Sequence, residues 1–192
     1  MRQNLISKST RKEMRKMKKL LVVVIAGMFL LGLSGIGMAQ TGSDNHTVTI
    51  VINEIAEINV TTASITLTVT APGTPGADPQ GDTDNTTYLQ YTSTVASGQT
   101  RTIDAKLDAA MLSGLSLAVQ ATPGSGEGTS AGSVTLSTTD QSVITSIGSC
   151  ATGTGGTDGA QVTYTLSVTD PTQLTINAGA NYTVTYTLTD DA

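Results

Sequence analysis

The chain has 192 residues, of which 38% are hydrophobic and 13% are charged, and its formal net charge is −5. Eight of the ten Lys and Arg side chains lie within residues 1–19, together with only one acidic side chain. The rest of the chain is therefore strongly acidic. A surface of this kind argues against nucleic acid or an anionic membrane as a partner, because both repel negative charge.

The first 39 residues have the order of a secretory signal peptide. A basic region, 1–19, is followed by an uncharged apolar region, 20–33, and Gly37 and Ala39 supply the small side chains typical of a cleavage site. The apolar region has about 14 residues, fewer than the roughly 20 that span a bilayer. We therefore expect cleavage after Ala39, a mature chain without an integral membrane segment, and a secreted, periplasmic or cell-surface location.

The predicted mature chain, 40–192, is long enough for one domain with a real core. It carries two basic and 14 acidic side chains, a formal net charge of −12. There is no Trp, and the only Phe lies in the leader, so Val, Ile, Leu, Ala and Tyr must form the core. We expect a flexible N-terminus over 40–46 and a single domain over 47–192.

Alternation with a period of two dominates the mature chain from its start. In "HTVTIVINEIAEINV", residues 46–60, the even positions from Val48 to Val60 are apolar with the single exception of Glu54. This pattern predicts β-structure over 47–60. A strand of that length would be unusually long, so we expect either two strands broken near Glu54 or one segment that extends beyond its own domain.

Further short strands follow, separated by loops rich in Gly, Pro and Asp. The stretch after 107 could form a helical turn, but Thr and Ile before it favour a strand and Gly114 ends any helix. The alternation predicts strands over 64–70, 86–95, 99–107, 115–121, 133–138, 142–147, 161–168, 171–176 and 181–188. Long loops are expected over 71–85, 122–132 and 148–160.

About nine short strands with close turn signals and no convincing helix indicate an all-β fold. We predict an antiparallel immunoglobulin-like β-sandwich, with one face of each sheet buried and a Thr-rich face in water. A β-helix is the alternative fold, and the absence of a fixed repeat period disfavours it. In the closing strand, Tyr182, Val184, Tyr186 and Leu188 should face the core, and Asp190 and Asp191 should discourage edge pairing.

Several chemistries lack the residues that they need. His46 is the only His and Cys150 the only Cys, so the chain offers neither a His base for a nucleophile nor three His or Cys ligands for zinc. A lone Cys150 cannot form a disulfide within the chain. An isopeptide bond would need a buried Lys106, but Lys106 occupies an outward position in the alternation of the predicted strand 99–107. We therefore expect no enzyme activity and no cofactor other than Ca²⁺.

One loop has the composition of a calcium site. "ADPQGDTDN" places Asp78, Asp82 and Asp84 close together, with Asn85 adjacent, in a Gly- and Pro-rich stretch. Carboxylate and amide oxygens on a flexible loop are what Ca²⁺ requires. The spacing is not that of an EF-hand, and a solvated acidic loop is the alternative interpretation.

Four Asn residues lie in Asn-x-Thr sequons, namely Asn45, Asn59, Asn85 and Asn181. The mature chain is rich in Thr and Ser, so about half of these would arise by chance. They are candidate glycosylation sites in an archaeon, whereas in most bacteria they would be silent.

The end of the chain, "INAGANYTVTYTL", is similar to bacterial fimbrial and spore-coat-U-like subunits. Their final strand often follows a Gly-x-Tyr-x turn, and here Gly179 to Tyr182 match it with one residue inserted. In such families an N-terminal extension completes the sheet of a neighbouring subunit. The resemblance implies that residues 47–60 are a candidate donor strand. The disulfide that many of these subunits carry is missing here.

From these features we expect a non-enzymatic, exported structural or surface protein that pairs through strand edges, either with itself or with another surface protein. The alternative is an extracellular binding module for a glycan, Ca²⁺ or a protein ligand. Few planar aromatic side chains are available for a sugar-binding platform, and this weighs against the glycan.

Overall fold

The computed structural model describes residues 42–191. The chain divides into two units, residues 1–50 and residues 51–192. In the first unit the described residues, 42–50, have no regular secondary structure and are exposed to solvent. The predicted signal peptide, residues 1–39, lies outside the described residues. Every strand of the described chain belongs to the second unit.

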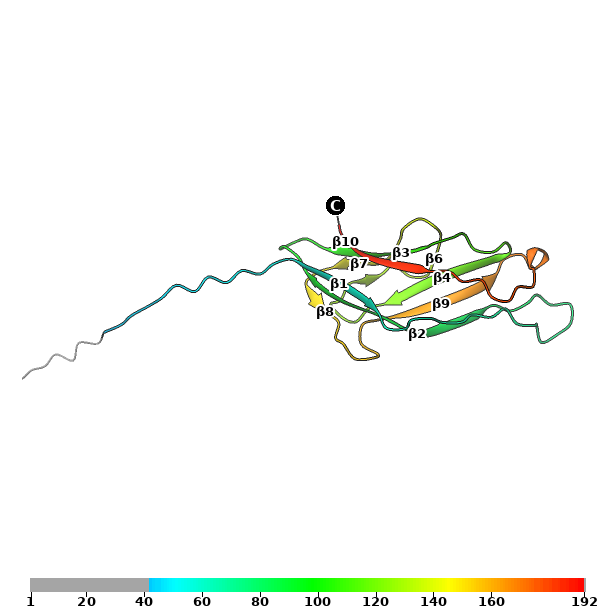
Figure 1. Ribbon diagram of the computed structural model, residues 1–192, viewed down its shortest axis with the longest axis horizontal. Helices are drawn as coiled ribbons and strands as arrows, with labels where there is room; N and C mark the ends of the chain where they lie inside the picture. The colour runs from blue at the N-terminus through cyan, green and yellow to red at the C-terminus, as the bar shows by residue number, and fades with distance from the viewer. Residues whose placement is uncertain (1–41, 192) are drawn as a thin grey trace, which may run out of the picture. The chain divides into compact units, whose positions relative to one another are not determined.

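The second unit is built from β-strands, with a single turn of 3₁₀ helix between the last two (Figure 1). The strands are β1 (Ile55–Val60), β2 (Asp82–Thr94), β3 (Arg101–Leu107), β4 (Leu115–Thr122), β5 (Thr129–Ser130), β6 (Val134–Thr135), β7 (Gln141–Ile147), β8 (Cys150–Ala151), β9 (Ala160–Val168) and β10 (Val184–Asp190).

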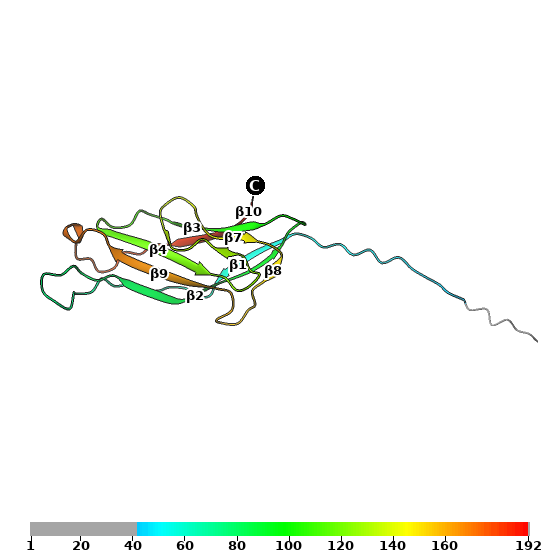
Figure 2. The ribbon, with the colours of Figure 1, turned by 180° about the vertical axis from the view of Figure 1, so that it is seen from behind.

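These strands form two antiparallel sheets, and the predicted β-sandwich is confirmed. The larger sheet has the order β1-β2-β9-β4-β6, with β8 also paired to β2. The smaller sheet has the order β10-β3-β7-β5. From both sides of the molecule, β2, β9 and β4 lie next to one another in one layer (Figures 1 and 2). Within residues 42–191, no helix is long and apolar enough to cross a membrane.

The core lies between the two sheets and follows the alternation of the sequence. In β3, the inward residues Ile103, Ala105 and Leu107 are at most 2% exposed, whereas the residues between them are partly exposed. The same alternation runs along β4 and β9 in the facing sheet, where most inward side chains are buried and the outward positions, mainly Thr, Ser and Gln, are more exposed. Aliphatic side chains and tyrosines therefore fill the core, as the composition predicts.

Two predicted strands are wrong. Residues 64–70 form no strand and make only an isolated bridge, Thr70 with Gln80. The backbone N–H of Thr68 donates instead to the Asp82 carboxylate at 3.1 Å, although Ile65 and Leu67 still pack against the core as their parity predicts.

The other error is the segment 171–176, which contains the 3₁₀ turn Pro171–Gln173 in place of a strand. Pro171 fixes the backbone for a helical start and has no N–H to donate to a sheet. Asp170 caps this turn, and its carboxylate accepts from the Thr172 backbone N–H at 2.9 Å. The pairing of proline with a preceding cap residue was the signal for a turn at this position.

Candidate functional site

The segment that the sequence analysis singled out, residues 47–60, is divided by the structure at Glu54. Residues 55–60 form β1, which pairs antiparallel with the Leu89–Thr94 stretch of β2 in the same molecule. Residues 47–54 have no regular secondary structure. Regular structure thus begins directly after Glu54, the one polar residue on the even face of the segment.

The part before Glu54 exposes an unusual amount of apolar surface. Val48, Ile50, Val51 and Ile52 are between 69% and 81% exposed to solvent. Burying one such side chain is worth about 1.5–3 kcal/mol. Contiguous exposed apolar side chains of this kind mark interaction sites on soluble proteins. Their β-branched character also favours extended structure.

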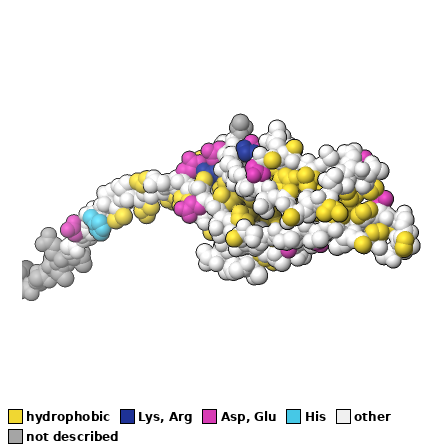
Figure 3. Space-filling model, turned by 45° about the vertical axis from the view of Figure 1, so that its right-hand side comes forward, with side chains coloured by type: hydrophobic (Ala, Val, Ile, Leu, Met, Phe, Trp, Pro, Cys, Tyr) yellow, Lys and Arg dark blue, Asp and Glu magenta, His cyan; other side chains and the backbone are white. Residues whose placement is uncertain are grey.

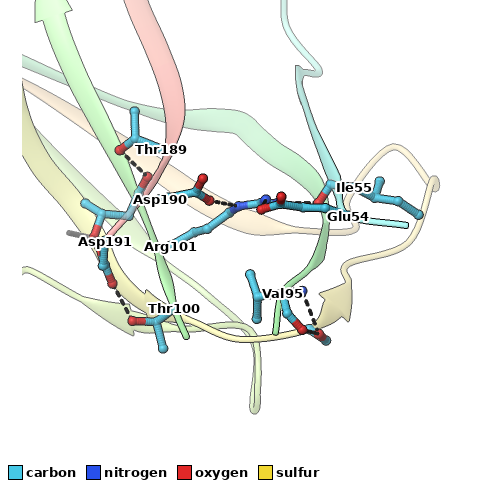
Figure 4. A network of polar contacts seen from close by, with 10 residues as sticks. Glu54, Ile55, Val95, Thr100, Arg101, Thr189, Asp190 and Asp191 are labelled. Carbon is cyan, nitrogen blue, oxygen red and sulfur yellow. Dashed lines mark hydrogen bonds and ion pairs between the residues drawn. The ribbon is translucent and has the colours of Figure 1, made fainter. Parts of the chain in front are cut away.

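A buried arginine fixes the point at which this segment joins the sandwich (Figure 4). The Arg101 side chain is 2% exposed and lies at the start of β3. Its Nε donates to Asp190 Oδ1 at 2.6 Å, while its terminal nitrogens donate to the Glu54 carboxylate and to the backbone carbonyl of Ile55. Arg101 therefore ties the first residue of β1 to the last residue of β10 across the two sheets.

The two C-terminal aspartates also turn toward their own sheet. Asp191 accepts hydrogen bonds from the hydroxyls of Thr100 and Thr102, the latter at 2.5 Å. These hydrogen bonds lower the pKa of Asp191, and the hydrogen bond that Arg101 donates to Asp190 contributes most to raising the pKa of Arg101. The carboxylates of Asp190 and Asp191 are thus used in contacts with β3 and its preceding loop.

Charge is sparse on the face of the molecule shown in Figure 3. Acidic and basic side chains lie next to one another in one region, and apolar patches and single acidic side chains are scattered over the remainder of this face. In the described residues the one ion pair outside the Arg101 cluster joins Lys106 to Asp140 at 3.0 Å, and both side chains are exposed. Lys106 therefore points outward, as its parity predicts.

The structure does not gather the three aspartates of the predicted calcium loop. Asp82 and Asp84 lie in β2 rather than in a loop. Asp82 accepts from the N–H groups of Thr68 and Thr83, while Asp84 accepts from the N–H and hydroxyl of Thr86. Among residues 42–191 no group of three or more His, Cys, Asp or Glu side chains is arranged to hold a metal ion. The calcium site stays a prediction.

The remaining candidate residues are distributed over the molecule. All four sequon asparagines are exposed to solvent, which leaves their side chains accessible. His46 is exposed in the segment 42–50. Cys150 is half-buried in β8, and burial raises the pKa of its thiol.

The role of Arg101 was not among the predictions from the sequence. Parity could have found it, because Arg101 lies on the same face of its strand as Ile103, Ala105 and Leu107. An inward-facing Arg needs carboxylate partners, and the acidic residues flanking the strands were the candidates. Sequence alone does not say which of them converge, since Glu54 and Asp190 are far from Arg101 along the chain.

Comparisons with protein-family models, with curated proteins and with solved structures find no match to the chain.

Proposed function

We propose that this protein is a non-enzymatic, exported structural protein of the cell surface, which self-associates by pairing of strand edges. The observation that carries the proposal is the run of exposed apolar side chains from Val48 to Ile52, directly before edge strand β1. A segment of this composition gains free energy by adding to a sheet edge, where backbone hydrogen bonds and apolar burial act together.

The chemistry of the chain supports a structural role. The single His lies in the exposed segment 42–50, away from any strand, and the single Cys is a half-buried residue of a two-residue strand. The leader-like sequence of the first 39 residues supports export. The acidic surface supports solubility outside the cell.

The test measures association of the purified protein. Light scattering after size-exclusion chromatography, followed by electron microscopy, should show oligomers or filaments that grow with protein concentration. A triple variant, Val48→Ser, Ile50→Ser and Ile52→Ser, should remain monomeric with an unchanged circular dichroism spectrum. The matched control, Thr47→Ser with Thr49→Ser, changes the polar face of the same segment and should associate like the wild type.

Two outcomes would overturn the proposal. The first is a wild-type protein that stays monomeric at the highest concentration reached. The second is a triple variant that associates as strongly as the wild type, because the exposed apolar side chains would then have no part in assembly.

A further inference from the structure

The four outermost strands of the two sheets are not equally open to pairing. In the larger sheet the outer strands are β1 and β6, and in the smaller sheet they are β10 and β5. β5 and β6 have two residues each, and such short edges offer little to pair with. β1 has six residues but carries Glu57 in its middle. β10 is the longest of the four, with seven residues.

Charged side chains or proline in an edge strand usually prevent it from pairing with a strand of another molecule. β10 has neither between Val184 and Thr189, and its only charged residue, Asp190, is directed to Arg101. The neighbouring Asp191 is likewise held by Thr100 and Thr102. Within the described chain, β10 pairs with β3 alone. Its second edge therefore makes no ladder hydrogen bonds within the described chain and is uncharged from Val184 to Thr189, and β1 approaches it at the end where Arg101 holds Ile55 near Asp190.

The inward face of β10 is also incompletely covered. Val184, Tyr186 and Leu188 pack against the core but are half-buried, whereas the inward residues of the neighbouring β3 are at most 2% exposed. Tyr186 reaches across the sandwich, where its hydroxyl lies 2.8 Å from that of Tyr164. Apolar side chains from one more strand beside β10 would complete the cover of this part of the core.

Residues 47–53 have the pattern that such a strand needs. Val48, Ile50 and Ile52 alternate with polar or β-branched residues, as Val184, Tyr186 and Leu188 alternate with Thr in β10. Both segments have seven residues. With Ile50 opposite Tyr186, these six apolar side chains would lie on the core side, whereas Val51 and the Thr residues would face water.

We propose that the free edge of β10 is the acceptor for residues 47–53 of a second copy of this chain, with Ile50 opposite Tyr186. This inference rests on the proposed function and specifies its interface. Strand addition supplies the backbone hydrogen bonds, and the three apolar side chains of the donor cover the half-buried face of β10.

A second copy is favoured over the same chain because of Arg101. It holds Glu54 and Ile55 beside Asp190, so β1 begins where β10 ends. To lie along its own β10, the segment 47–53 would have to reverse direction at Asn53 and Glu54. Tight reversals favour Gly, and the chain has none between Gly42 and Gly73.

Disulfide trapping tests the register. In a Cys150→Ser background, Thr49→Cys is combined with Thr187→Cys, which face each other if the two strands are antiparallel. In a second protein Thr49→Cys is combined with Thr185→Cys, which face each other if they are parallel. Either arrangement keeps Ile50 opposite Tyr186, and a disulfide requires the Cβ atoms to approach within about 4.5 Å.

We expect one of the two pairs to give disulfide-linked multimers on a non-reducing gel. Neither single-cysteine variant should form multimers beyond a dimer. The control pair Thr49→Cys with Thr163→Cys, on the central strand β9, should not link. A linked monomer would overturn the proposal, because the donor would then be the chain itself. If the protein associates but neither cysteine pair forms an intermolecular disulfide, the proposed β10 interface is wrong, whereas the proposed self-association is not contradicted.

A pair of charge variants gives a second, independent measurement. Ile50→Glu would place a carboxylate against the core beside Tyr186, whereas Thr49→Glu adds the same charge on the water side of the same segment. We expect Ile50→Glu to weaken self-association more than tenfold and Thr49→Glu less than threefold, with equal thermal unfolding of the two monomers. Equal weakening by the two variants would contradict the predicted parity.

Discussion

Arg101 Nε donates to Asp190 Oδ1 at 2.6 Å, and this contact joins the first residue of β3 to the last residue of β10. The arginine is buried, but its carboxylate partners are not: the side chains of Glu54 and Asp190 are 63% and 68% exposed. The cost of breaking the cluster should therefore depend on which partner is removed.

Removing the arginine should cost a moderate amount of stability. In Arg101→Met, the side chain keeps much of its apolar volume and the two carboxylates return to water, so we expect a loss of about 2 kcal/mol rather than the 3–5 of a fully buried pair. Urea denaturation measures the change. Lys106→Met, on the exposed face of the same strand, is the control and should cost less than about 1 kcal/mol. Equal losses in the two variants would contradict the buried role of Arg101.

Removing the carboxylates should cost more. The double variant Glu54→Gln with Asp190→Asn leaves a guanidinium in a buried site without a counter-charge, and we expect a loss of about 3–5 kcal/mol. The same urea experiment applies. Combining it with Arg101→Met should recover part of the loss, since the unpaired charge is then gone. A triple variant less stable than the double variant would rule this explanation out.

Much of the fold was predictable because the alternation of apolar and polar residues is strong from β2 to β4 and in β9. The wrongly predicted strands lie where a side chain competes with the sheet for a backbone N–H. The N–H of Thr68 donates to the Asp82 carboxylate, and the N–H of Thr172 donates to the Asp170 carboxylate. Parity cannot reveal such competition. The predicted loop 71–85 ends earlier than expected, because Asp82 and Asp84 already belong to β2, a strand whose pairing register shifts between Asp84 and Thr87.

The candidate interface was less predictable than the fold. The alternation of the sequence singles out the segment 47–60, but it also predicts that Asp190 and Asp191 discourage pairing at the edge of the last strand. The structure directs both carboxylates to Arg101, Thr100 and Thr102. Contacts between residues about 90 positions apart decide whether the edge of β10 is guarded, and no local pattern encodes them.

Asp191 should make stability depend on pH in the acid range. Its pKa is lowered by the hydroxyls of Thr100 and Thr102, so the folded protein holds the carboxylate in its charged form more tightly than the unfolded chain does. The stabilisation is present above the ordinary Asp pKa of about 3.9 and is lost as the pH falls through the lower folded value. We expect Asp191→Asn to be less stable than the wild type at neutral pH, by under about 1 kcal/mol because the group is near solvent.

Urea midpoints at neutral pH and at a pH well below 3.9 measure this effect. The difference between Asp191→Asn and the wild type should shrink in acid. Thr102→Val, which removes one donor, is the matched variant and should show the same trend. A difference that is constant with pH would show that Asp191 contributes through packing and not through its charge.

Three tyrosines that pack in the core should limit stability in alkali. Burial is the main cause that raises the pKa of Tyr91, Tyr164 and Tyr186, so these phenols stay neutral in the folded protein after an unfolded chain would have ionised them. Their contribution is complete below the ordinary Tyr pKa of about 10 and is lost as the pH rises above it. Phenolate absorbance from them should therefore appear together with the loss of the circular dichroism signal.

The variant Tyr186→Phe isolates the pair of hydroxyls in the core. It should cost about 1 kcal/mol at neutral pH, because the Tyr164 hydroxyl loses its partner at 2.8 Å. It should also reduce the alkaline sensitivity, since one raised pKa is removed. An unchanged alkaline midpoint would show that Tyr186 does not contribute to alkaline unfolding.

Gly159 is a position where the sandwich should tolerate a methyl group poorly. It precedes β9 with φ at +97°, and a Cβ there would lie 2.1 Å from the carbonyl oxygen of Leu89, which belongs to the paired strand β2. Gly159→Ala should therefore cost more than about 2 kcal/mol, since it combines backbone strain with displacement of a strand. Gly156→Ala, in the same loop, meets no atom within 4 Å and should change stability by less than about 0.5 kcal/mol. Thermal unfolding of the two variants side by side checks the prediction, and similar melting temperatures would mean that Leu89 and β2 can shift without cost.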